Sequence, residues 1–174
     1  MPSGTESRGL VTSKLVFLAL AMAWGFVLSG CSTAPSVPKS PVGAALPSRL
    51  TSEQSNDVTL YALGLVGTPY RYGGNTPASG FDCSGLIGHV YTTRTGVAPP
   101  RTVTRLQNWG QRVPNDDVRS GDLVIFGQRD MVSHAGIYVG GGRFVHAPST
   151  GGAVRLDNLN SSYWSSQQVA FRRP

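Results

Sequence analysis

The chain has 174 residues, of which 40% are hydrophobic, and its 15 Lys and Arg against 9 Asp and Glu give a formal net charge of +6. This length is sufficient for one domain with a core of its own. The arginines stand singly apart from Arg172-Arg173, and no basic stripe interleaved with aromatic residues occurs, which argues against a nucleic-acid-binding protein. A mildly basic surface suits an anionic partner, but it equally keeps a protein in solution.

The first 30 residues have the layout of an export signal. A polar start that contains Arg8 and Lys14 precedes the apolar run Leu15–Val27, and small residues follow this run. The run is shorter than the ~20 residues that cross a bilayer as a helix, so a permanent transmembrane anchor is the weaker interpretation. Cleavage near residue 30 is therefore expected.

The stretch Leu28-Ser29-Gly30-Cys31 resembles the bacterial lipobox, at which the signal peptidase cuts before the cysteine and the thiol carries a diacylglycerol. The resemblance implies that residues 1–30 are a lipoprotein signal peptide and that acylated Cys31 anchors the protein in membrane lipid. In proteins of this class Ser32 favours the outer membrane, and the protein would face the periplasm. Ordinary cleavage without lipidation remains the alternative.

The domain that we expect over residues 51–174 follows a linker, residues 31–50, which contains four prolines and four serines. A helix is predicted over residues 51–67. Thr51 and Gln54 form a capping box at its start, and apolar residues recur on one of its faces.

A second helix is predicted over residues 83–94, between the N-cap Asp82 and Gly96, and a short one over residues 103–109. Glycine-rich turns then separate five predicted strands: Leu123–Phe126, His134–Val139, Gly142–Ala147, Ala153–Leu156 and Gln168–Arg172. Helices followed by strands at hairpin spacing indicate an α+β domain with an antiparallel sheet.

Cys83 would begin the second helix, and with Cys31 lipidated it has no disulfide partner. Free N–H groups and the positive end of the helix dipole stabilise a thiolate there and lower the pKa of the thiol. The negative charge of Asp82 opposes this effect unless its carboxylate is engaged in capping. A buried, inert thiol is the alternative, because Cys83 shares the apolar face of the helix with Leu86 and Val90.

A nucleophilic thiol needs a base, and the chain has three histidines. His89 is six residues along the same helix and cannot reach Cys83, so we expect it on the surface or in helix packing. His134 and His146 lie on either side of Gly140–Gly142. A three-residue glycine loop places both imidazoles on one face within hydrogen-bond reach, whereas a two-residue loop places them on opposite faces.

The same-face arrangement predicts Cys83 as nucleophile, His134 as base and His146 as the residue that orients the His134 ring. Two alternatives stay open. In the first alternative, the two histidines are ordinary strand residues without a catalytic role. In the second, they form a zinc site with Cys83, although the sequence has no closely spaced pair of ligands to support such a site.

Five motifs resemble, in order and spacing, those of the NlpC family of bacterial cell-wall cysteine peptidases: YRYGG (70–74), GFDCSG (80–85), GDLVIF (121–126), SHAGIYVG (133–140) and FVHA (144–147). The resemblance implies a papain-like α+β fold, with N-terminal helices packed on an antiparallel β-sheet and residues 51–174 as the catalytic domain. It implies cleavage of peptidoglycan peptide stems through an acyl-enzyme thioester at Cys83, with His134 and His146, and no cofactor or metal.

The resemblance assigns roles to three further residues. The Tyr70 hydroxyl would assist the backbone N–H of Cys83 at the oxyanion, and Asp82 and Ser84 would bind substrate. Structural interpretations stay open beside these roles: Tyr70 as a core residue, Asp82 as an N-cap and Ser84 on the helix surface. Asp122 is interpreted as a turn residue.

We therefore expect a monomeric outer-membrane lipoprotein, a murein endopeptidase that hydrolyses amide bonds in peptidoglycan stems or crosslinks. A γ-D-glutamyl–diaminopimelate bond and a D-alanyl–diaminopimelate bond both fit a thiol hydrolase. One alternative is a non-catalytic wall-binding scaffold lipoprotein, against which the intact set of one cysteine and two histidines argues. The other is an amidase or acyltransferase on the same fold.

Overall fold

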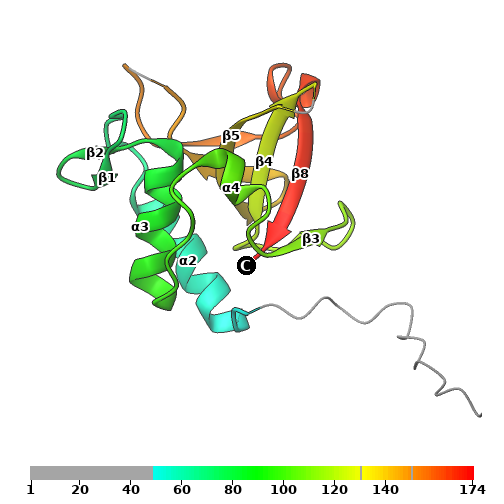
Figure 1. Cartoon of the computed structure of the whole chain (residues 1–174), viewed down its shortest axis with the longest axis horizontal. Helices are drawn as coiled ribbons and strands as arrows, with labels where there is room; N and C mark the ends of the chain where they lie inside the picture. Colours follow the sequence, from blue (N-terminus) through cyan, green and yellow to red (C-terminus); the bar gives the residue numbers. More distant parts are fainter. Residues whose placement is uncertain (1–48, 130, 150) are drawn as a thin grey trace, which may run out of the picture. The chain divides into compact units, whose positions relative to one another are not determined.

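The computed structural model describes residues 49–174 except 130 and 150 (Figure 1). The predicted signal peptide of residues 1–30, Cys31 and the linker up to residue 48 lie outside the described residues and stay predictions. Helices from the N-terminal part of the domain pack on a six-stranded antiparallel sheet, which confirms the predicted α+β fold. None of the helices in the described ranges has the length and apolar character needed to span a bilayer.

Helix α2 (Ser52–Gly64) begins at the predicted capping box. Thr51 Oγ1 accepts a hydrogen bond from the N–H of Gln54 at 3.1 Å, and Gln54 Oε1 accepts one from the N–H of Thr51 at 3.0 Å. The box uses backbone donors that have no partner inside the helix. Val58 and Ala62, one turn apart, are buried against the rest of the domain.

Helix α3 (Cys83–Thr95) matches its prediction closely. Asp82 caps its start, and Gly96 ends it with φ of 73°, a conformation that glycine adopts without strain. The short helix α4 (Val103–Leu106) ends three residues before the predicted limit. Local capping signals thus fixed where both longer helices begin.

Six strands form the main sheet in the order β3-β8-β4-β5-β6-β7. Their bounds are β3 (Gln111–Val113), β4 (Leu123–Gln128), β5 (Met131–Gly140), β6 (Arg143–His146), β7 (Arg155–Asn158) and β8 (Gln168–Arg173). A second, two-stranded sheet pairs β1 (Asn75–Thr76) with β2 (Gly80–Phe81), and a 3-10 turn, η1, covers Trp164–Ser166. The five predicted strands are present with shifted ends. Strands β1, β2 and β3 were not predicted because two or three residues are too few to show an alternating pattern.

The β5–β6 hairpin has the predicted register but reaches it in another way. Ile137 pairs with Val145, as the three-residue loop predicts. The turn itself contains only Gly141-Gly142, because Gly140 pairs with Arg143. A bulge directly before Gly140 inserts one extra residue into β5, and this restores the parity that a two-residue turn alone would reverse.

Two apolar clusters cover the two faces of the sheet. The first joins the helices to the sheet and contains Ile87 of α3 together with Ile125 and Ile137. The second contains the aromatic rings of Phe126 and Phe144, with other residues. Because successive strand residues point to opposite faces, the side chains next to Ile125 and Val145 along their strands belong to the second face.

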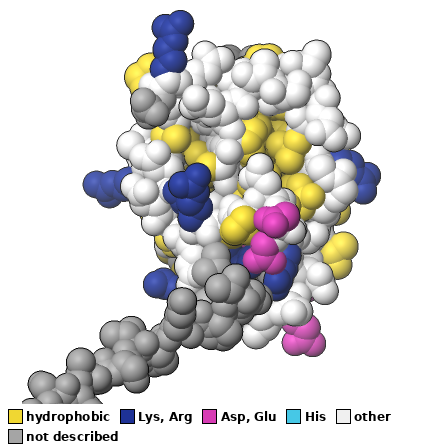
Figure 2. Space-filling view, turned by 90° about the vertical axis from the view of Figure 1, so that its right-hand side faces the viewer, with side chains coloured by type: hydrophobic (Ala, Val, Ile, Leu, Met, Phe, Trp, Pro, Cys, Tyr) yellow, Lys and Arg dark blue, Asp and Glu magenta, His cyan; other side chains and the backbone are white. Residues whose placement is uncertain are grey.

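The side of the domain on which β8 lies in Figure 1 faces the viewer in Figure 2. Apolar side chains gather in the middle of this face, and the Lys and Arg side chains stand apart from one another around it. No continuous basic patch is visible on this side, in keeping with the scattered arginines of the sequence.

Candidate active site

Cys83 is the first residue of α3 and a free cysteine. The backbone N–H groups of Ser84, Ala135 and Cys83 itself lower the pKa of its thiol, but burial, first, and the charge of Asp82 outweigh them, so the pKa is raised. Burial and the charge of Asp82 thus outweigh the helix N-terminus at this thiol, although the Asp82 carboxylate is engaged in capping. Since Ala135 directly follows His134 in β5, the sulfur lies beside the strand that carries the predicted base.

His134 and His146 share one face of the sheet, as predicted. His134 Nε2 lies 2.8 Å from His146 Nδ1, with the two rings nearly perpendicular at 82°. His146 is fully buried, and burial is the main cause that lowers the pKa of His134 to about 3 and that of His146 to about 4. Both imidazoles are therefore neutral at pH 7. The indole of Trp164 stacks on His134 and meets His146 edge-on, which holds both rings in place.

Asp157, a residue that sequence reasoning missed, extends this pair. Its Oδ2 lies 3.0 Å from His146 Nε2 and also accepts hydrogen bonds from Trp164 Nε1, at 2.8 Å, and from the guanidinium of Arg155. Burial raises the pKa of Asp157, but the hydrogen bonds from Trp164, Arg155 and His146, together with the charge at His146, outweigh it and keep this pKa below its usual value. The predicted strand Ala153–Leu156 ends one residue before Asp157. The sequence therefore does not predict that Asp157 lies on the same face of the sheet as His146.

Asp82 and Ser84 are both engaged within the protein. Asp82 Oδ1 accepts from the N–H of Gly85 at 2.6 Å and its Oδ2 from the N–H of Gly73 at 2.9 Å, which confirms Asp82 as the N-cap. Ser84 is buried, with 6% of its surface exposed, and its hydroxyl lies 3.0 Å from Asp82 Oδ1 and 2.9 Å from the carbonyl oxygen of Arg101. The interpretation of Ser84 as a helix-surface residue is wrong.

Tyr70 lies in the loop before β1 and is partly buried. Burial raises the pKa of its hydroxyl, and charge at Cys83 and Asp82 raises it further. The phenol therefore stays protonated at neutral pH and lies within the electrostatic reach of the sulfur, as an oxyanion donor must.

His89 and Asp122 lie outside this cluster. His89 Nε2 is 2.9 Å from the Tyr61 hydroxyl and its ring packs against Phe81, so it is a helix-packing residue as expected. Asp122 caps a turn as predicted, because it accepts from the N–H of Arg119 at 2.8 Å. It also forms a buried ion pair with Arg173 at 3.0 Å, which the turn interpretation did not include.

The zinc alternative finds no matching ligand set in residues 49–174, apart from the two undescribed positions. No three His, Cys, Asp or Glu side chains of this region are grouped as metal ligands. Instead, His134 Nε2 and His146 Nδ1 form a hydrogen bond with each other.

The relatives of this chain include two named hydrolases. The chain is 37% identical over 112 residues to the murein DD-endopeptidase MepH of Escherichia coli, covering 62% of this chain and 41% of that protein. It is 39% identical over 110 residues to the gamma-DL-glutamyl hydrolase of Bacillus subtilis, covering 62% of this chain and 26% of that protein. It therefore spans less than half of the length of either relative.

A crystal structure of the NlpC/p60 domain of the peptidoglycan hydrolase SagA has the same fold. Its TM-score with this chain is 0.59 at 30% sequence identity, and the match covers 67% of this chain and 96% of that one. The sequence pattern of the NlpC/P60 family matches residues 67–173, more than half of the chain. This chain belongs to the NlpC/P60 family.

Proposed function

We propose that this protein is a cysteine peptidase that hydrolyses amide bonds in the peptides of peptidoglycan. The observation that carries the proposal is the His134–His146 hydrogen bond of 2.8 Å, together with a free thiol at the start of α3 that contacts the backbone N–H of Ala135, the residue after His134. The relatives support the substrate class, since one is named a murein DD-endopeptidase and the other a gamma-DL-glutamyl hydrolase.

The protons of the two histidines follow from Asp157. A carboxylate only accepts, so the single N–H of neutral His146 lies on Nε2 and donates to Asp157. His146 Nδ1 then accepts from the Nε2–H of His134. The lone pair on His134 Nδ1 is left to take the proton of Cys83, so Asp157 sets the tautomer of the base through His146.

In the proposed reaction, His134 Nδ1 takes the thiol proton as the sulfur of Cys83 attacks the amide carbonyl. The backbone N–H of Cys83 and the Tyr70 hydroxyl donate to the oxyanion. His134 then gives its proton to the amide nitrogen, the C–N bond breaks, and the amine half leaves. Water, deprotonated by His134, hydrolyses the thioester and restores the thiol.

The anchor is a separate part of the proposal. Acylation of Cys31 and export behind residues 1–30 would hold the enzyme at the outer membrane, with the linker over residues 31–50 extending toward the wall. The lipobox-like sequence supports this arrangement. Mass spectrometry of the N-terminal peptide from membrane-extracted protein tests it, because an unmodified Cys31 would contradict the anchor.

The activity is tested with the purified mature chain and isolated peptidoglycan. Cys83→Ala should release no soluble muropeptides above the buffer control, because the sulfur forms the covalent intermediate. His89→Gln, a matched change to the histidine outside the cluster, should retain release. Liquid chromatography with mass spectrometry identifies the products and separates an endopeptidase from an amidase or acyltransferase. Equal release by the wild type and Cys83→Ala would leave the non-catalytic wall-binding scaffold as the better account.

A further inference from the structure

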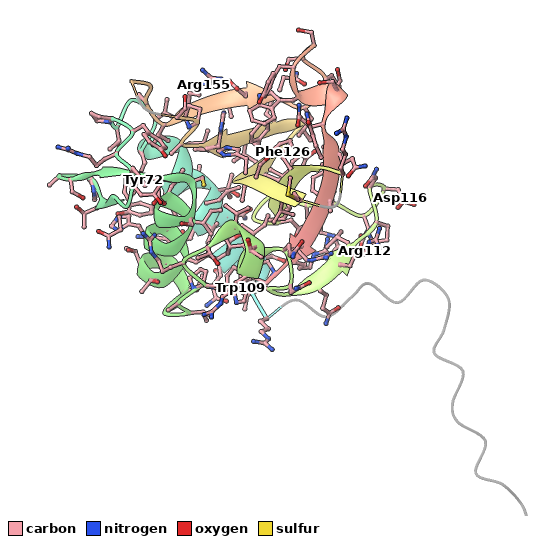
Figure 3. All side chains as sticks on the ribbon, turned by 45° about the horizontal axis from the view of Figure 1, so that its top comes forward. Tyr72, Trp109, Arg112, Asp116, Phe126 and Arg155 are labelled. Carbon is pink, nitrogen blue, oxygen red and sulfur yellow. The ribbon has the colours of Figure 1, made fainter. Side chains whose placement is uncertain are left out.

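An open groove of about 400 Å³ lies at His134, and its lining includes residues of β4, β5, β7 and η1 but none of α3. Trp164 and Phe126 form part of its apolar lining, and Tyr163 and Arg155 lie at it as well. In Figure 3, Arg155 and Phe126 lie over the sheet, whereas Tyr72, in the loop before β1, lies beside α3. No residue of the loop that carries Tyr70 is among the lining residues of the groove.

The chemistry of the proposed function, on which this inference rests, decides which half of the substrate occupies the groove. The acyl carbon binds to the sulfur of Cys83, whereas the departing nitrogen takes its proton from His134 and must lie within hydrogen-bond reach of that ring. His134 lines the groove and Cys83 does not. The groove therefore extends from the position of the departing nitrogen, on the amine side of the scissile bond.

Arg155 gives this groove its charge preference. Its side chain is 55% exposed, and its Nε and one terminal nitrogen contact Asp157 Oδ2 at 3.1 and 2.9 Å. Those contacts fix the guanidinium plane with two of its five N–H groups. Among the described lining residues Arg155 is the one with a full charge, because His134 is neutral and no carboxylate lines the groove. Asp157 lies behind Arg155 and partly offsets its charge.

We propose that the groove binds the amine half of the substrate and that Arg155 binds a free carboxylate on the carbon that bears the departing nitrogen. In a D-alanyl–diaminopimelate crosslink this carbon carries a free carboxylate. In the stem, the corresponding carboxyl after the γ-D-glutamyl bond is already tied in the next amide. Arg155 therefore selects the crosslink over the stem bond.

The test uses two synthetic crosslink peptides with the same D-alanyl half. One has a free carboxylate beside the departing nitrogen and the other has a carboxamide there. The wild type should cleave the carboxylate peptide with a kcat/KM about tenfold higher, because a charge-assisted hydrogen bond is lost in the carboxamide. Arg155→Gln should bring this ratio close to one. Arg143→Gln, which removes the same charge from the turn end of β6, should keep the wild-type ratio.

Arg155 also donates hydrogen bonds to Asp157, so Arg155→Gln should cleave both peptides more slowly than the wild type. The readout is therefore the ratio of kcat/KM between the carboxylate and the carboxamide peptide, not either rate alone. A wild-type ratio near one, or an unchanged ratio in Arg155→Gln, would overturn the assignment while leaving the hydrolase intact. Failure of the proposed function looks different, since neither peptide nor whole peptidoglycan would then be cleaved by the wild type.

A second measurement needs no turnover. In Cys83→Ala, titration with the diaminopimelate amine half should shift the NMR signal of the Trp164 indole N–H. The carboxamide form should shift it much less, and Arg155→Gln should remove the difference. Equal shifts from both forms would also overturn the assignment.

Discussion

The carboxylate of Asp157 acts on the histidine pair both as a hydrogen-bond acceptor and as a negative charge. Burial lowers the pKa of His134 to about 3 and of His146 to about 4, and Asp157 opposes this at both rings. In the proposed mechanism His134 becomes an imidazolium when it takes the thiol proton. The charge of Asp157 stabilises that cation through His146, so its contribution grows as the reaction proceeds.

Asp157→Asn should therefore slow the reaction and change its pH dependence. The amide keeps the shape but loses the charge, so we expect kcat to fall by about tenfold or more with little change in KM. Activity requires neutral His134 and is lost as the pH falls through its pKa. Without the carboxylate this pKa is lower still, so the acid limb of the pH–kcat profile should move to lower pH.

A pH–kcat series on the wild type and Asp157→Asn checks this result, with Asp57→Asn as the matched control on an exposed carboxylate that pairs with Arg94. A merely structural role for Asp157 would reduce activity equally at every pH. An acid limb in the same place as in the wild type would therefore contradict the proposed role.

At the scale of elements, the start of α3 combines a strong cap with an unfavourable charge. Asp82 accepts from Gly85 and Gly73, which joins the helix to the loop that carries Tyr70. The same carboxylate, together with burial, raises the pKa of Cys83 against the helix N–H groups. In the proposed mechanism Cys83 therefore starts as a thiol, and its proton passes to His134 during the attack.

Asp82→Asn should separate these two effects. Asparagine caps a helix about as well as aspartate, so the free energy of unfolding should change by less than about 1 kcal/mol. Loss of the negative charge should lower the pKa of Cys83. The pH dependence of iodoacetamide alkylation measures this pKa in the wild type and the variant.

Asp82→Ala provides the contrast, since it removes the charge and the cap together and should cost about 1 kcal/mol of stability. If Asp82→Asn alkylates with the wild-type pH dependence, the charge of Asp82 is not what helps to keep the thiol protonated.

At the scale of the whole molecule, the buried histidines link stability to pH. The pKa values of His134, His146 and His89 are all lowered in the folded state. Below the ordinary histidine pKa of about 6.5 the unfolded chain binds protons that the folded chain does not. The free energy of unfolding therefore decreases as the pH decreases. The lowered pKa values of Asp117 and Asp157 act in the same direction, but only below about pH 5, where unfolded carboxylates begin to protonate.

His146 alone, with a folded pKa of about 4, should account for a loss of about 2 kcal/mol in the free energy of unfolding between pH 7 and pH 5. His146→Gln should reduce the pH dependence in this window by about that amount. Urea denaturation at both pH values measures it, and the comparison uses the change with pH rather than the absolute stability. Parallel pH dependences in the wild type and the variant would contradict the burial of a neutral His146.

Much of the fold followed from the sequence because its signals are local. The capping box of Thr51 and Gln54, the N-cap Asp82 and the C-terminal Gly96 lie within a few residues of the helix ends that they set. The register expected for a three-residue glycine loop predicts His134 and His146 on one face of the sheet, where the structure has them. The structure reaches this register with a two-residue turn and a bulge instead of a three-residue loop.

The sequence alone determined the helix starts and the cysteine at the helix N-terminus, because hydrogen bonds and side-chain periods over a few residues specify them. The shared face of His134 and His146 is predicted from a three-residue loop, whereas the structure reaches it through a two-residue turn and a bulge. Only the tertiary structure decided the partner of His146, the burial of Ser84 and the direction of the Cys83 pKa. These depend on which distant segments meet and on how much water they exclude. Asp157 reaches His146 because β7 pairs with β6, and no spacing within either segment encodes that contact.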